Sequence, residues 1–269
     1  MGIDILSYGL TVIAFAVLAV LMAVSFRGNA LAGRLLACCV AMSVWALAVI
    51  VAARATAITL EMLLVVEAVR NVVLLWAVFA IGRQVLPRWL PKASYAAIAA
   101  GTIFGLANSW LPESSRVVID VAANPQWLAR TALLCACIGL VSLEQIYRNA
   151  STLQRWSLRF LMFGFGIVFA YDLFLYSQFE LFRAFPLDAW TARGAVMAIA
   201  VPMLAIGIRR HPEGMPTLFV SRQVVFYTGA FLAMGLYLIV VAGGGYYVRL
   251  VGGNWGSFAQ ILLLSGSLT

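Results

Sequence analysis

The fold is decided by uncharged stretches such as RLLACCVAMSVWALAVIVAAR, residues 34–54, which has an arginine at each end and no charged residue between them. A helix needs about 20 apolar residues to cross the hydrocarbon core of a bilayer, and this stretch has that length. Lipid offers no partner for backbone N–H and C=O groups, so such a stretch must close its own hydrogen bonds as a helix. The pattern predicts about nine helices, the last one truncated. They are expected at residues 5–25, 32–53, 61–82, 92–110, 127–147, 157–180, 191–208, 223–247 and 257–269.

The composition is that of a polytopic membrane protein. Of the 269 residues, 64% are hydrophobic and only 10% are charged, and the mean hydropathy is +1.00. These values favour one all-α domain over residues 1–269, a transmembrane helix bundle with the lipid bilayer as its surroundings. The net charge of +8 would suggest a nucleic-acid partner in a soluble protein. Here the cations lie at helix ends, where they meet lipid headgroups, so we expect no nucleic-acid partner.

Lysine and arginine gather in alternate gaps between the expected helices. The first, third, fifth and seventh gaps hold Arg27, Arg34, Arg83, Arg88, Lys92, Arg148, Arg155, Arg159, Arg209, Arg210 and Arg222. The other gaps hold fewer, namely Arg54, Arg116, Arg183, Arg193 and Arg249, with Arg130 at a helix edge. Cytoplasmic loops are enriched in these cations, so the N-terminus is predicted outside and Thr269 in the cytoplasm.

Three polar residues, Glu67, Arg70 and Asn71, interrupt the third apolar stretch. Their spacings of three and four residues place them on one face of a helix, where they can pair with each other. One interpretation is an ion pair that holds helices together. The other is a ligand-sensing or gating cluster, because charge within a membrane is often functional.

The second half of the sixth helix is also polar for a lipid-facing segment. Asp172 and Tyr176 are four residues apart and share a face, which we expect to point into the bundle. A polar pocket that opens outward between the third and sixth helices would explain them, and so would a set of interhelical hydrogen bonds. In the seventh helix, Pro202 removes one backbone donor and is expected to kink the helix.

Known catalytic and metal-binding patterns do not fit this sequence. Its one histidine, His211, has no second ligand cluster around it, and it lies in a short turn before a proline. The cysteines, Cys38, Cys39, Cys135 and Cys137, fall inside apolar runs and are expected to be small buried hydrophobes. We therefore assign no catalytic, cofactor-binding or metal-binding residue.

From about Arg155 onward the chain carries a series of distinctive segments. These are RFL (159–161), FAYDLFLYS (169–177), ARG (192–194), AVP (200–202), FVSRQVVFY (219–227), GYYVRL (245–250), GNWG (253–256) and LSGSL (264–268). Together they resemble the N-terminal membrane region of the PrsK family, the histidine kinases associated with the exosortase/PEP-CTERM protein-sorting system.

The resemblance implies a location in a bacterial inner membrane and a two-component signalling role. In that family the membrane part is followed by a GAF-like sensor and a kinase core, which act on a response regulator, and homodimers are usual. Because this chain ends on an apolar segment, we expect it to be the front part of such a protein.

The leading hypothesis is therefore a membrane-embedded sensory and anchoring module of a PrsK-like histidine kinase. The alternative is a small multi-helix transporter or channel whose pathway passes the same polar residues. The sequence lacks the paired broken helices of many transporters, which disfavours that alternative. An intramembrane enzyme would need catalytic residues that we do not find.

The predicted orientation can be tested with reporters fused after Thr269. Green fluorescent protein should fluoresce at this position and alkaline phosphatase should be inactive, because the first folds in the cytoplasm and the second only outside it. Active alkaline phosphatase at this position would contradict the charge-based topology.

Overall fold

A computed structural model describes residues 3–24, 29–54, 60–110, 124–182 and 185–210. The regular secondary structure of this part of the chain is entirely helical, with no strand. Seven helices are present, and each lies where the sequence predicts one, so the all-α class is confirmed. The helices expected at residues 223–247 and 257–269 lie outside the described residues. The observed helices are α1 (Ile3–Val24), α2 (Ala30–Arg54), α3 (Leu60–Ile81), α4 (Trp89–Trp110), α5 (Asn124–Asn149), α6 (Thr152–Phe182) and α7 (Leu187–Arg210).

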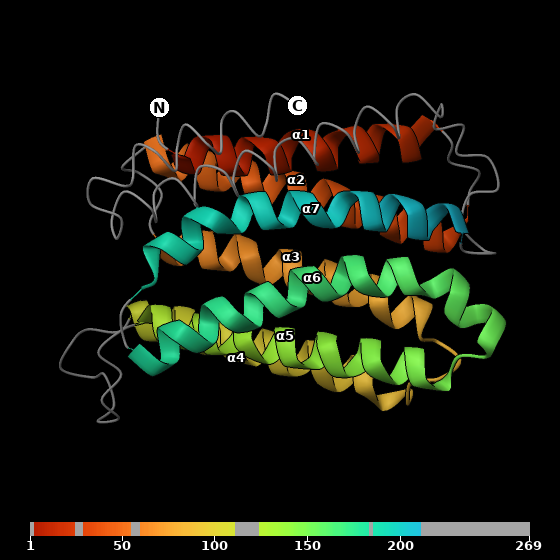
Figure 1. Cartoon of the computed structure of the whole chain (residues 1–269). Coiled ribbons are helices and arrows are strands. Elements are labelled where there is room, and N and C mark those ends of the chain that lie inside the picture. The colour runs from red at the N-terminus through yellow and green to blue at the C-terminus, as the bar shows by residue number, and fades with distance from the viewer. Residues whose placement is uncertain (1–2, 25–28, 55–59, 111–123, 183–184, 211–269) are drawn as a thin grey trace, which may run out of the picture. The chain divides into compact units, whose positions relative to one another are not determined.

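By their mutual contacts, six of the helices close into a ring. Figure 1 shows the helices running alongside one another, with α4 next to α5. Going round the ring, α1 packs on α2, α2 on α3, α3 on α5, α5 on α6, α6 on α7, and α7 again on α1. The same six helices are long and apolar enough to cross a membrane. The seventh, α4, lies outside the ring against α5 and α3. A bundle of this kind is a multi-pass membrane protein in its architecture.

The start of α6 is set by local capping. Ser151 and Gln154 form a capping box at the start of α6: the backbone N–H of Ser151 donates to Gln154 Oε1 (3.1 Å), and that of Gln154 donates to Ser151 Oγ (3.4 Å). This cap starts α6 five residues before the expected position. Helix α7 also starts early, at Leu187 rather than residue 191, which moves Arg193 well inside the helix.

Side chains fill the middle of the ring. Phe15 of α1, Met42 of α2 and Phe165 of α6 are almost fully buried and line a small apolar cavity there. The opposite faces of the helices are apolar and exposed, as lipid contact requires. Three of the cysteines are buried as expected, but Cys137 is exposed on α5, so the expectation for that residue is wrong.

Two glycines of α7 bring backbones into contact. A Cβ atom on Gly194 would lie 2.6 Å from the carbonyl carbon of Ser7 in α1, and one on Gly207 would lie 2.5 Å from the backbone nitrogen of Leu161 in α6. Only glycine allows these approaches, so α7 is wedged between α1 and α6. Pro202 lies between the two glycines, and the helix continues past it to Arg210. The kink expected at Pro202 stays a prediction.

The close contact of Gly194 with α1 predicts that replacing Gly194 by alanine destabilises the bundle. The added methyl must push α1 away from α7, at a cost of about 1–3 kcal/mol in the free energy of unfolding. Unfolding in mixed micelles by denaturing detergent measures this. The matched control is Gly9→Ala on α1, where an added Cβ meets nothing within 4 Å. Equal stabilities of the two variants would contradict the interpretation that glycine is needed where α7 approaches α1.

Candidate functional site

Four charged side chains from three helices meet in the interior of the ring. Glu67 and Arg70 come from α3, Asp172 comes from α6, and Arg193 comes from α7. Their exposed fractions are 0%, 1%, 1% and 0%, respectively. We call these four residues the charge cluster. With both carboxylates ionised its net charge is zero, which is the condition under which burial of charge is tolerable.

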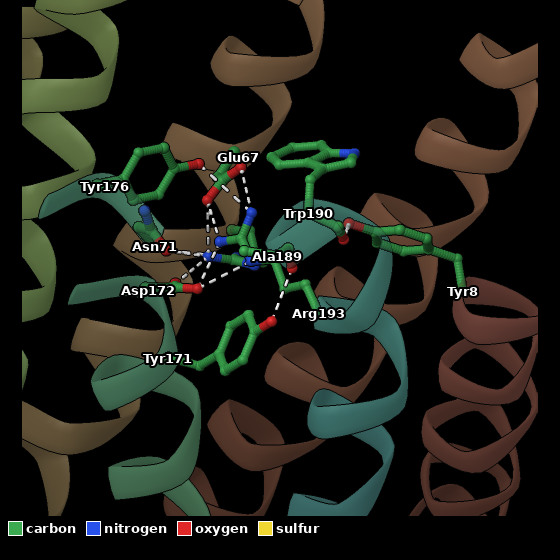
Figure 2. A network of polar contacts seen from close by, with 10 residues as sticks. Tyr8, Glu67, Asn71, Tyr171, Asp172, Tyr176, Ala189, Trp190 and Arg193 are labelled. Carbon is green, nitrogen blue, oxygen red and sulfur yellow. Dashed lines mark hydrogen bonds and ion pairs between the residues drawn. The ribbon is translucent and has the colours of Figure 1, made fainter. Parts of the chain in front are cut away.

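Each carboxylate contacts both arginines (Figure 2). Arg70 Nη2 donates to Glu67 Oε1 (3.1 Å) and to Asp172 Oδ2 (2.5 Å). Arg193 donates from Nε to Asp172 Oδ1 (3.0 Å) and from Nη1 to Glu67 Oε2 (3.0 Å). Arg193 Nη2 also bonds both acids, Asp172 Oδ1 at 2.5 Å and Glu67 Oε1. The four charges therefore form a closed circuit of ion pairs that joins α3, α6 and α7.

Neutral side chains complete the surroundings of the cluster. Asn71 Oδ1 accepts from Arg70 Nη2 (2.8 Å), and Tyr176 OH accepts a longer bond from Arg193 Nη1 (3.4 Å). The indole ring of Trp45, from α2, faces both cations, with its centroid 4.3 Å from Arg70 Cζ and 4.8 Å from Arg193 Cζ. A ring at this distance stabilises a desolvated cation through its electron-rich face.

Three buried donors around the cluster have no hydrogen-bond partner in the described part of the chain: Arg70 Nη1, Asn71 Nδ2 and Trp45 Nε1. They belong to side chains that contact one another through the Arg70 guanidinium. A buried unsatisfied donor is costly, so this is where a group that offers oxygen acceptors would gain most by binding.

The first turns of α7 are tied to the neighbouring helices by side-chain hydrogen bonds. Tyr171 of α6 donates to the carbonyl of Ala189 (2.7 Å), and Tyr8 of α1 donates to that of Trp190 (2.8 Å), as Figure 2 shows. One turn further, Thr11 of α1 donates to the carbonyl of Gly194 (2.5 Å). These bonds hold Arg193 in place, because they fix the backbone on both sides of it.

The residues singled out in the sequence come together as a group. Glu67, Arg70 and Asn71 share one face of α3, and Asp172 and Tyr176 of α6 lie opposite them. At 0–1% exposure, these side chains do not line an open pocket. The interhelical hydrogen bonds that were the second interpretation are present.

One prediction about Arg193 is wrong. It was assigned to an outer gap as a topology signal, but it lies inside α7 and is the second cation of the cluster. The expected start of α7 was four residues too late, so that Arg193 stood at the edge of the expected helix, as its third residue rather than its seventh, and was counted with the gap before it. Charge balance could have revealed it, since Glu67, Arg70 and Asp172 alone leave one unpaired negative charge in the membrane.

The charge cluster consists of paired charges that are held in fixed positions. Its carboxylates are occupied by guanidinium donors, and no group of three His, Cys, Asp or Glu side chains suited to a metal ion occurs among the residues that the structure describes. The chemistry available to the cluster is the exchange of one set of ion pairs for another.

Comparisons of this chain with protein-family models, with curated proteins and with solved structures found no match.

The cluster predicts a large cost for Arg193→Met, which keeps an unbranched side chain and removes the guanidinium group with its charge. Two carboxylates would then share one arginine in a buried site, and we expect a loss of about 3–5 kcal/mol in the free energy of unfolding. Unfolding in mixed micelles checks this value. Adding Glu67→Gln to that variant restores neutrality and should recover part of the loss.

Arg130→Met provides the matched control. Arg130 Nη2 pairs with Glu180 Oε1 at 2.7 Å, but the two side chains are 36% and 29% exposed. Removing this solvent-accessible pair should cost about 1 kcal/mol or less. If Arg193→Met were no more destabilising than Arg130→Met, the charge cluster would contribute no more to the stability of the bundle than an exposed ion pair does.

Proposed function

We propose that this bundle is the membrane-embedded sensory and anchoring module of a PrsK-like sensor histidine kinase. In this proposal it passes a signal to cytoplasmic GAF and kinase domains outside the chain. The observation that carries the proposal is the charge cluster, which joins α3, α6 and α7 by ion pairs between side chains buried to 99% or more. A buried circuit of four charges has few alternative arrangements, so it is suited to switch between discrete packings.

The mechanism is a shift between two packings of the bundle. A ligand that favours a different pairing of Arg193 with Glu67 and Asp172 would move α7 relative to α3. The ligand can shift the equilibrium between the two packings only by as much as its affinities for them differ. Such a ligand could gain hydrogen bonds from the unpaired donors of Arg70, Asn71 and Trp45.

Helix α7 is the element suited to carry the movement across the membrane. It has 24 residues, which corresponds to about 36 Å of helix. Arg193 lies near its first end, and Arg209 and Arg210 lie at its last turn. By the charge-based orientation the last turn is cytoplasmic, so a displacement at the cluster would arrive on the side where kinase domains would be.

The resemblance to the PrsK family rests in part on residues of the charge cluster and its surroundings, which supports the proposal. Two of the segments that carry it, residues 169–177 and 192–194, contain Asp172, Tyr176 and Arg193. These are the α6 and α7 contributions to the cluster and its surroundings.

The proposal is tested by Asp172→Asn in the parent kinase, once the reading frame after codon 269 has been read and found to encode GAF and kinase segments. Asparagine keeps the shape of the side chain but leaves Arg70 and Arg193 with one carboxylate. We expect the output of a response-regulator reporter to change several-fold, up or down, at an unchanged level of protein in the membrane.

Arg130→Gln is the control, because it removes an ion pair outside the cluster. It should leave the reporter output unchanged. An Asp172→Asn kinase with normal membrane level and normal output would show that the cluster is structural and would overturn its assignment as the switch. A stop codon directly after Thr269 would overturn the kinase assignment itself.

A further inference from the structure

Two arginines share one aromatic ring where α6 begins and α7 ends. Arg159 Cζ lies 4.7 Å and Arg210 Cζ lies 4.5 Å from the centroid of the Phe160 ring. Arg210 also faces the ring of Trp156, at 4.4 Å. Two like charges are thus held near one another by side chains that carry no negative charge.

No described acidic side chain balances these two cations. The ion pair observed near this end of the bundle is Arg148 with Glu144 (3.3 Å), and it leaves Arg159 and Arg210 without a carboxylate within the described ranges. Arg210 Nη1 is buried and has no hydrogen-bond partner among the residues that the structure describes. Paired guanidinium groups in this state attract an anion with several oxygen acceptors, such as a phosphate ester.

The backbone that carries the two arginines is firmly positioned. Ser157 Oγ donates to the carbonyl of Arg210 (2.6 Å), so the last residue of α7 is bonded to the second turn of α6. One turn back, Gly207 lies directly against the backbone of Leu161. The two guanidinium groups are therefore presented by two helix ends that cannot separate without breaking this packing.

The site is flanked by apolar surface that faces outward. Trp156 is 55% exposed, and Phe163, two turns further along the same face of α6, is 63% exposed. Tryptophan at the level of the headgroups with an apolar side chain deeper in the membrane is the arrangement that a lipid molecule contacts along its length. A soluble phosphate would use the arginines but not this flank.

We propose that Arg159, Arg210 and Trp156 form a binding site for the headgroup of an anionic phospholipid, with its acyl chain along Phe163. Guanidinium groups bind the phosphodiester, and Trp156 covers the glycerol region. The site is separate from the charge cluster and does not depend on the signalling role proposed above.

Titration of the purified full-length chain in a zwitterionic detergent tests the site, with phosphatidylglycerol and phosphatidylcholine as probes and bound lipid counted by native mass spectrometry. The wild type should bind phosphatidylglycerol saturably and in preference to phosphatidylcholine. The double variant Arg159→Gln/Arg210→Gln should bind phosphatidylglycerol about tenfold more weakly or worse, as the loss of two cations near an anionic lipid requires. Arg159→Lys/Arg210→Lys, which keeps both charges, should retain most of the binding.

The matched control is Arg83→Gln/Arg88→Gln, which removes two exposed arginines from the turn after α3, in a gap predicted to lie on the same side of the membrane. It should leave the affinity within about twofold of the wild type. Equal losses in both double variants would show a diffuse electrostatic effect and overturn the site. Displacement of the lipid by inorganic phosphate at comparable concentrations would show a phosphate site instead and overturn the lipid assignment. Circular dichroism confirms that every variant keeps its helix content.

Discussion

The structure depends on the pairing of two arginines with two carboxylates in a place that water does not reach. An isolated charge in such a place costs several kcal/mol, and the cost is offset only when every member keeps its partners. Glu67 and Arg70 of α3 therefore need Asp172 of α6 and Arg193 of α7 at hydrogen-bond distance. This requirement sets the spacing and rotation of three helices at once. Gly194, one residue after Arg193, lets α7 lie close to α1, and this close approach allows α7 to meet the requirement.

Much of the fold was predictable because the bilayer leaves so few choices. Apolar stretches of sufficient length must be helices, and all seven described helices were located from this property alone. Their order around the ring was not predictable. It depends on contacts between helices distant in sequence, such as α1 with α7 and α3 with α5, and every apolar helix face resembles every other. The position of α4 outside the ring was not predicted either, because it depends on the contacts of α4 with α5 and α3.

The candidate site was predictable in part. Helical spacing placed Glu67, Arg70 and Asn71 on one face, and the polar end of the sixth helix indicated Asp172 and Tyr176. Arg193 was missed because a charge near a helix end looks like a topology signal, and a boundary error of four residues placed it at the edge of the expected helix. Trp45 was missed because an aromatic residue in an apolar run is usually core. Its role follows from where α2 faces, which only the assembled bundle reveals.

The closure of the ring between its first and last described helices has a consequence for biosynthesis. The hydroxyls of Tyr8 and Thr11 find their acceptors on Trp190 and Gly194, more than 180 residues later in the chain. The first helix can pack on the second early, but the ribosome must deliver nearly the whole described bundle before the first helix can dock on the seventh. Until α6 and α7 are made, Glu67 and Arg70 lack their partners on those helices and pair with each other, as they do within one turn of α3. That local bond lets the third helix enter the translocon with its two charges already neutralised, well before their final partners exist.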